Sequence, residues 1–242
     1  MNVSEIKRDE LDAFNAELYQ DLASANSLEQ ATQDFVTAFY RKFEESIILL
    51  RAFVTLRMAE SPEEIQTFAR GLAMGAGVTL DPSSYLLTLF GTAGEEPAWF
   101  VRRKSQGHLC IPLATPDFVN SIPMMSALLE ELGFDLGWVR GEPEIVANKL
   151  GSLSGTFYVS EARENRDRQG RLIIAAQDFV KQYGVRTVFG NGGGFIGTDK
   201  FSTVICFLRV PIERERAEVF QTIGTSYRRR AFEHVLEGSF WD

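Results

Sequence analysis

His108 and Cys110 are the residues whose types and spacing point most directly to chemistry. On a β-strand they would point to the same side of the sheet, where an imidazole and a thiol facing one pocket could bind haem or a metal ion. A closed zinc site needs four ligands, and the other histidine, His234, lies far away in the sequence. We therefore expect both residues to pack and hydrogen-bond at a ligand pocket, without a metal ion.

The sequence offers little support for a catalytic thiol or serine, because each needs partner residues that are not evident here. A nucleophilic thiol needs a lowered pKa and a resolving partner. Cys206 instead lies between Ile205 and Phe207, in an apolar run where a buried and inert thiol is the usual state. Neither of the two histidines lies near a G-x-S-x-G motif that would provide a serine nucleophile. No catalytic set emerges, and we expect a protein without catalytic activity of its own.

Aromatic side chains offer a different kind of site, because ligand pockets are mostly apolar with a few polar groups. With 19 Phe, 6 Tyr and 3 Trp, ordinary core packing is the better interpretation of any one aromatic position. The basic run Arg102, Arg103 and Lys104 could meet an anionic ligand, although a solvated turn is favoured. The candidate ligand-binding residues are Trp99, Arg102, His108, Cys110, Trp138, Phe157 and Tyr158.

Composition narrows the class of protein. The 242 residues carry a formal net charge of -8 and no basic stripe, which argues against a nucleic-acid binder. No uninterrupted apolar run approaches the roughly 18 residues of a membrane span, and the N-terminus has no apolar signal region. Two distant cysteines are typical of reduced thiols. We expect a cytoplasmic protein.

The stretch from Arg186 to Val210 organises the expected fold. It contains two β-rich runs separated by glycines at positions 190, 192, 193, 194 and 197. A phosphate-binding loop would require a helix directly behind the glycines, but the run from Phe201 to Val210 is typical of a strand. We therefore predict a hairpin whose wide turn is formed by the glycines.

The remaining pattern predicts an α+β architecture, with helices packed on one antiparallel sheet. The central strands should include Ile47 to Arg57, with one covered face, and Phe201 to Val210. Other strands are expected at Tyr85 to Thr92, Trp99 to Leu113 and Phe157 to Ser160. Helices are expected at Glu5 to Ala23, Ser27 to Phe43, Ser61 to Ala73, Thr115 to Gly133, Leu172 to Tyr183 and Glu213 to Glu237, the last roughly 35 Å long.

Several segments resemble the sensory GAF domains of bacterial signalling proteins. They are TLFGTAGEEPAW, GHLCIPLA, GTFYVSEA, QDFVKQYGVRTVFGNGGGFIG and STVICFLRVPI. The resemblance runs from about Ser27 to the final helix. It implies a GAF-like fold and a sensory or regulatory module that binds a small molecule or a protein partner, whose identity stays open, as does any cofactor. No output motif is evident after Val210, so the output protein would be a separate chain unless the sensor is free-standing.

Two other function classes stay open. Some GAF-fold enzymes use cysteines to reduce free methionine sulfoxide, although the clustered cysteines of that enzyme are not visible here. Substitution of Cys110 and Cys206 would separate that activity from a sensor. A pure scaffold would instead have both sheet faces packed solid, with no cavity.

We divide the chain into an N-terminal helical extension (residues 1–26), a GAF-like sensory domain (27–212) and a C-terminal helix (213–242). We predict a homodimer joined through the two terminal helices, whose apolar stripes would pair across a two-fold axis. The alternative is that both helices fold back on their own domain. The stripes are Leu11, Phe14, Leu18 and Leu22 in one helix, and Ala217, Phe220, Gly224, Tyr227, Ala231 and Val235 in the other.

Overall fold

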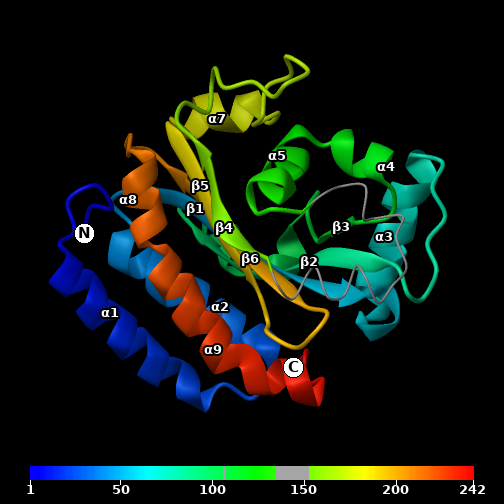
Figure 1. Ribbon diagram of the computed structural model, residues 1–242, viewed down its shortest axis with the longest axis horizontal. Helices are drawn as coiled ribbons and strands as arrows, with labels where there is room; N and C mark the ends of the chain where they lie inside the picture. Colours follow the sequence, from blue (N-terminus) through cyan, green and yellow to red (C-terminus); the bar gives the residue numbers. More distant parts are fainter. Residues whose placement is uncertain (106, 135–152) are drawn as a thin grey trace.

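Six antiparallel strands form one sheet in a computed structural model that describes residues 1–105, 107–134 and 153–242 (Figure 1). The strand order is β3-β2-β1-β6-β5-β4. The central strands are therefore β1 and β6, as the sequence predicts. The bounds are β1 Ile47–Arg57, β2 Tyr85–Gly94, β3 Cys110–Pro112, β4 Ser154–Val159, β5 Thr187–Gly194 and β6 Phe201–Leu208.

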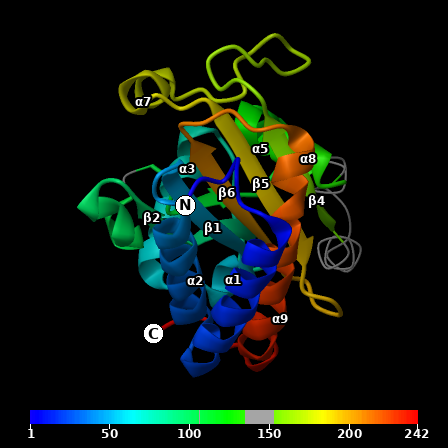
Figure 2. The same cartoon turned by 90° about the vertical axis from the view of Figure 1, so that its left-hand side faces the viewer.

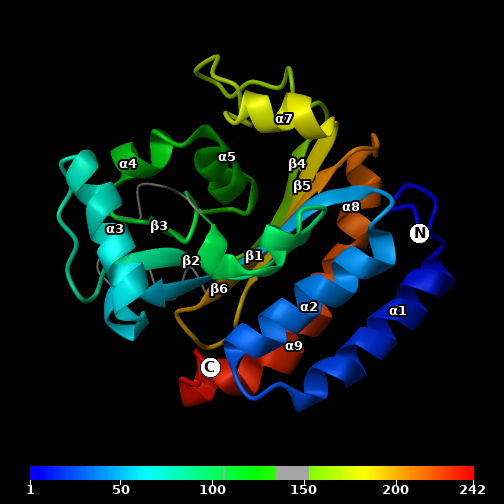
Figure 3. The same cartoon turned by 180° about the vertical axis from the view of Figure 1, so that it is seen from behind.

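Helices cover both faces of the sheet. One face carries α1 (Arg8–Asp21), α2 (Leu28–Phe43), α8 (Arg214–Val219) and α9 (Gln221–Glu237), with α1, α2 and α9 side by side in Figure 2. The helix α3 (Glu63–Gly75) packs on the β2–β3 end of this face (Figure 3). The opposite face carries α4 (Pro116–Asn120), α5 (Pro123–Glu131) and α7 (Gln177–Tyr183). No helix in the described ranges is both long and apolar enough to cross a membrane.

The central strand β1 is buried on both faces, whereas the sequence predicts one covered face. Leu50 and Val54 pack in the core beneath α1, α2 and α9. Leu49 and Phe53 pack in the second core, on the opposite face. The apolar run at Ile47–Arg57 is therefore the signature of a strand with helices above and below it.

The predicted glycine turn is wrong in position, because four of its five glycines, at positions 190, 192, 193 and 194, lie within β5 itself. A Cβ atom on Gly192 would lie 2.7 Å from the ring of Phe201, and one on Gly193 would lie 2.7 Å from Cζ of Arg228. The strand needs glycine because neighbouring side chains fill that space. The turn follows at residues 195–200, where Gly197 has a φ of +78°.

The predicted single C-terminal helix is broken at Phe220 into α8 and α9. The apolar stripes of α1 and α9 are buried in one core together with α2, including Phe14, Leu18 and Tyr227. The ring of Tyr227 stacks on Phe35 at a centroid distance of 4.6 Å. All three predicted segments of the chain thus contribute to one core, so the stripes are not free to join two copies. The homodimer stays a prediction that would need another surface.

The contact between α2 and β2 is tight. A bulge lies at Phe90, and a Cβ atom added to the next residue, Gly91, would lie 2.7 Å from the carbonyl oxygen of Thr32. Gln33 accepts a hydrogen bond from the backbone nitrogen of Thr92 at 3.1 Å and donates one to its carbonyl oxygen at 3.0 Å. The backbone of α2 therefore leaves no room for a side chain at Gly91.

We expect Gly91→Ala to lower the free energy of unfolding by about 1–3 kcal/mol, the usual cost of overpacking, because the backbone of α2 must move away from β2. Chemical denaturation measures the change. Gly71→Ala is the control, since a Cβ atom there has open space within α3. It should be neutral or stabilise by up to about 1 kcal/mol. Equal losses in the two variants would contradict this account of the helix–sheet contact.

Candidate ligand-binding site

Arg51 and Thr92 place a guanidinium and a hydroxyl side by side on the largely apolar face of the sheet opposite α2. Arg51 of β1 is paired directly with Thr92 of β2 in the antiparallel register. Directly opposed residues project to the same face. Arg51 lies two residues from both Leu49 and Phe53 and so shares their face of the sheet. The guanidinium and the Thr92 hydroxyl therefore both lie on the face that carries α4, α5 and α7.

Residues 97–105, here called the wrapping segment, cover the edge of β2 that β3 leaves unpaired. The sequence predicts a strand from Trp99 to Leu113, but of the residues described in this range only Cys110–Pro112 form a strand. The wrapping segment instead forms two 3₁₀ turns, η3 (Pro97–Phe100) and η4 (Arg102–Lys104). Strand β3 pairs with Leu86 to Thr88 only, so the later part of β2 has an open edge that these turns cover.

The wrapping segment is attached to both faces of the sheet. Trp99 packs against Phe179 and Tyr183 of α7, at ring-centroid distances of 5.9 Å and 4.9 Å. On the other face, Phe100 contacts Tyr40 of α2 at 5.7 Å. Contacts to two layers hold the segment across the edge of β2.

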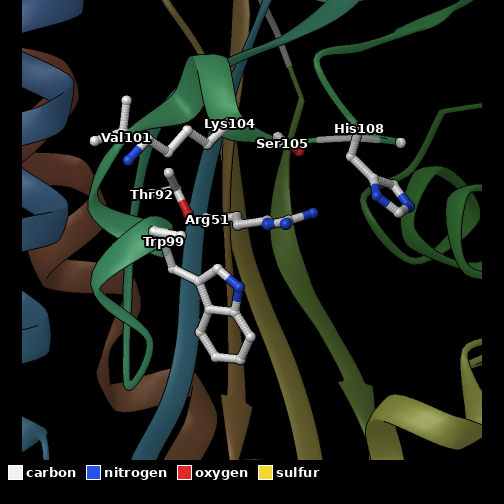
Figure 4. Close-up of a pocket in the computed structure, with 9 residues that line it drawn as sticks. Arg51, Thr92, Trp99, Val101, Lys104, Ser105 and His108 are labelled. Carbon is white, nitrogen blue, oxygen red and sulfur yellow. The ribbon is translucent and has the colours of Figure 1, made fainter.

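A cavity of about 410 Å³ lies between the sheet and the wrapping segment (Figure 4). Figure 4 shows the Arg51 side chain extending from β1 toward the side on which His108 lies. The volume falls within the range of small-molecule sites. The lining residues are Arg51, Thr92, Ala98, Trp99, Val101, Lys104, Ser105, Gly107 and His108.

Three buried polar atoms of this cavity make no hydrogen bond within the described chain. They are Nε of Arg51, Oγ1 of Thr92 and Oγ of Ser105. Buried polar groups in folded proteins are nearly always paired, and leaving one unpaired costs on the order of 1–3 kcal/mol. A polar molecule bound in this cavity would find three hydrogen-bonding groups that the described chain leaves unpaired.

The electrostatics of the cavity are positive. Burial lowers the pKa of Arg51 to about 10, which still leaves the guanidinium charged at neutral pH. Lys104 adds a second cation to the lining. Partial desolvation, and then the charge of Arg51, lower the pKa of His108, so its imidazole is mainly neutral at pH 7 and can both donate and accept.

A second cavity of about 590 Å³ is a weaker candidate. It lies beside α8 and is lined by Ser4, Pro211, Ile212, Glu213, Glu215, Arg216 and Val219. None of these residues carries a buried polar atom without a partner in the described ranges. Its lining therefore shows no unmet hydrogen-bonding requirement, in contrast to the lining around Arg51.

Of the predicted site residues, Trp99 and His108 line the cavity around Arg51. Arg102 does not, because its guanidinium bonds to the carboxylate of Glu29 on α2 and lies 5.0 Å from the ring centre of Trp241. It anchors the wrapping segment rather than facing a ligand.

The other predicted site residues lie apart from the cavity. Phe157 is fully buried in the core of the α5 face. The Tyr158 hydroxyl donates to the carbonyl oxygen of Ile212, 2.6 Å away. Cys110 packs with α3 on the opposite face of the sheet. The sequence-based prediction that it shares a pocket with His108 is therefore wrong. Trp138 lies outside the described residues.

One feature of the sequence could have identified Arg51 as a site residue, although the alternation of apolar and polar residues along the strand does not reveal it. Arg51 stands in the middle of the apolar run IILLRAFVTL. A charged residue at the centre of a doubly covered strand must be paired or serve a site. Thr92 and Ser105 have no comparable signal, because their burial depends on strand register and on the path of the wrapping segment.

The sequence matches no protein-family model and no curated protein. Among solved structures, it is similar to the GAF domain of a phosphoenolpyruvate-protein phosphotransferase from Coxiella burnetii. The two are 10% identical with a TM-score of 0.49, over 97% of this chain and 100% of that one.

It is also similar to the chromophore-binding domain of the bacteriophytochrome RpBphP3 from R. palustris, at 8% identity and a TM-score of 0.48, covering 97% of this chain. A longer structure of RpBphP3 gives 9% identity and a TM-score of 0.46, covering 96% of this chain. The chain spans 64% and 39% of these two bacteriophytochrome chains. The predicted α+β architecture, one antiparallel sheet with helices packed on it, is confirmed, and these likenesses assign no ligand or activity.

Arg51→Met should raise the free energy of unfolding of the ligand-free protein by on the order of 1 kcal/mol, because it removes an unpaired buried donor and keeps an apolar stem. Arg57→Met is the matched control on the same strand, since Nε of Arg57 lies 2.9 Å from the Asp199 carboxylate. Loss of that partly exposed ion pair should lower stability by up to about 1 kcal/mol. Denaturant titration of both variants measures the two changes in the free energy of unfolding, which should have opposite signs. A loss of stability in Arg51→Met would contradict this prediction.

Proposed function

We propose that this protein is a cytoplasmic regulatory module that binds a small molecule in the cavity around Arg51 and acts on a separate output protein. The observation that carries the proposal is the cavity itself, in which three buried polar atoms lack partners within the described chain. A scaffold with both sheet faces packed solid would not have this cavity between sheet and wrapping segment. Binding of a ligand would satisfy atoms that the fold leaves unpaired.

The wrapping segment supports a sensory role, because it joins the cavity to the helices of the opposite face. Trp99, Lys104 and Ser105 line the cavity, whereas Arg102 lies between them in sequence and bonds to Glu29 of α2. A ligand that moves the segment would therefore also change the contacts of α2. Such a connection is the kind of element through which binding can alter a distant surface.

The described residues of the cavity do not form the arrangement that catalysis by a serine requires. Ser105 and His108 both line it, but Oγ of Ser105 has no hydrogen-bond partner in the described chain. A serine nucleophile needs a base within hydrogen-bond reach and a third group that orients the base. This geometry favours binding over acyl transfer.

The thiol-based alternative, a free methionine sulfoxide reductase, has little support from the positions of the cysteines. Cys110 is aligned with Thr88, whereas Cys206 is aligned through Leu50 with Ala93, five residues further along β2. Three strand spacings add roughly 14 Å across the sheet. The two residues are too far apart for a disulfide, which needs Cα atoms within about 7 Å.

Burial also opposes thiolate formation at both cysteines. It raises the pKa of the Cys110 thiol to about 12 and that of Cys206 well above its usual value. We expect both thiols to resist a thiol reagent until the protein unfolds. Cys110→Ala and Cys206→Ala should leave methionine sulfoxide turnover at background, measured by coupled oxidation of a dithiol. Turnover that disappears in either variant would establish the reductase instead.

A cavity-filling substitution tests the sensor proposal without changing charge. Ala98 lines the cavity and is exposed, so Ala98→Trp should fold and block the site. Ala16→Trp, on the exposed side of α1, is the matched control. We expect mass spectrometry of the purified proteins, or a thermal-shift screen of metabolites, to find a ligand that wild type and Ala16→Trp bind and Ala98→Trp does not. Unchanged binding by Ala98→Trp, or no ligand for wild type, would contradict the proposal.

A further inference from the structure

We propose that the cavity recognises a small oxyanion, a carboxylate or phosphate group, with Arg51 as its principal binding residue and the hydroxyls of Thr92 and Ser105 beside it. This inference rests on the proposed ligand-binding function and names the chemistry of the ligand. Figure 4 shows the three side chains around the same space, with Arg51 coming from the sheet and Ser105 from the wrapping segment.

The first argument is the uncompensated charge of Arg51. Its side chain makes no hydrogen bond or ion pair with any described residue, and its Nε is buried. A guanidinium in this position has lost part of its hydration without gaining a counterion. An anionic ligand supplies that counterion, whereas a neutral ligand would leave the charge unbalanced.

The second argument is that the two carboxylates just before the wrapping segment in the sequence, Glu95 and Glu96, are already bonded elsewhere. Glu95 pairs with Arg209. Glu96 accepts a hydrogen bond from the hydroxyl of Tyr183 at 3.1 Å. No acidic side chain lines the cavity among the described residues, while Lys104 does line it. The charge that the site lacks is therefore negative.

The third argument is the geometry of the available donors. A guanidinium presents a planar fork of N–H groups that matches the two oxygens of a carboxylate or phosphate. The Thr92 and Ser105 hydroxyls have no competing partner in the described chain and can each donate to the same group. Together these groups provide donors from the floor and from the wall of the cavity.

The fourth argument concerns size. A cavity of about 410 Å³ accommodates a small organic molecule, close to the lower end of ligand sites. The walls formed by Ala98, Trp99 and Val101 offer apolar surface for the remainder of the molecule. The ligand class is thus a small anion with a compact apolar or aromatic body.

The test measures the melting temperature of the full chain against benzoate, malonate and inorganic phosphate, with benzamide as the neutral counterpart of benzoate and chloride at matched ionic strength. We expect at least one oxyanion to raise the melting temperature in a saturable way and benzamide to have no such effect. The carboxylate and phosphate arms distinguish which oxyanion the site prefers. Binding in Ala98→Trp should be lost, because that variant blocks the cavity.

Charge variants assign the effect to Arg51. Arg51→Gln should weaken oxyanion binding at least about tenfold, which is the usual contribution of a charge-assisted hydrogen bond, and Arg51→Lys should retain an intermediate affinity. Arg103→Gln removes the same charge from the wrapping segment at an exposed residue that does not line the cavity. It should bind like wild type, which excludes a general effect of net charge.

Two results would overturn the inference. One is the absence of any stabilisation by the three oxyanions beyond that of chloride. The other is equal oxyanion binding by wild type and Arg51→Gln. If a neutral molecule instead binds wild type and not Ala98→Trp, the oxyanion inference fails while the proposed ligand-binding function stands.

Discussion

The buried charge of Arg51 is the constraint on which the candidate site depends. A sheet covered on both faces excludes water from its central strands, and a guanidinium placed there needs polar surroundings. The protein provides them by pairing Arg51 with Thr92 across β1 and β2 and by placing Ser105 above the same face. The cavity is therefore a polar site within the otherwise apolar core on the face that carries α4, α5 and α7.

The wrapping segment forms one wall of this cavity. It covers the edge of β2 beyond the short strand β3, and its side chains separate to the two faces of the sheet. Trp99 contacts α7 on one face, and Arg102 bonds to Glu29 of α2 on the other. On the far side of the strand, Gln33 bonds to the backbone of Thr92, whose hydroxyl lines the cavity. Helix α2 is thus connected to the cavity by two separate routes.

How far the site can be predicted from the sequence depends on how local each interaction is. Trp99 and His108 are found because their residue types are rare and suit a pocket. Arg102 is chosen for its charge, but its partner Glu29 is 73 positions away, and no local pattern reveals that pair. Cys110 is assigned to the wrong face because His108 lies before the strand begins, so simple alternation does not relate the two.

The sequence by itself determined the α+β class, the two central strands and the helices with clear apolar periodicity, because these follow from hydrophobic patterns within a few residues of each other. Only the tertiary structure decided where the glycines of β5 lie, since Phe201 and Arg228 occupy the space above them. It also decided that Arg51 faces Thr92, because strand register depends on pairing between distant segments. The cavity exists through that register and through the path of the wrapping segment, neither of which is encoded in any single stretch of the chain.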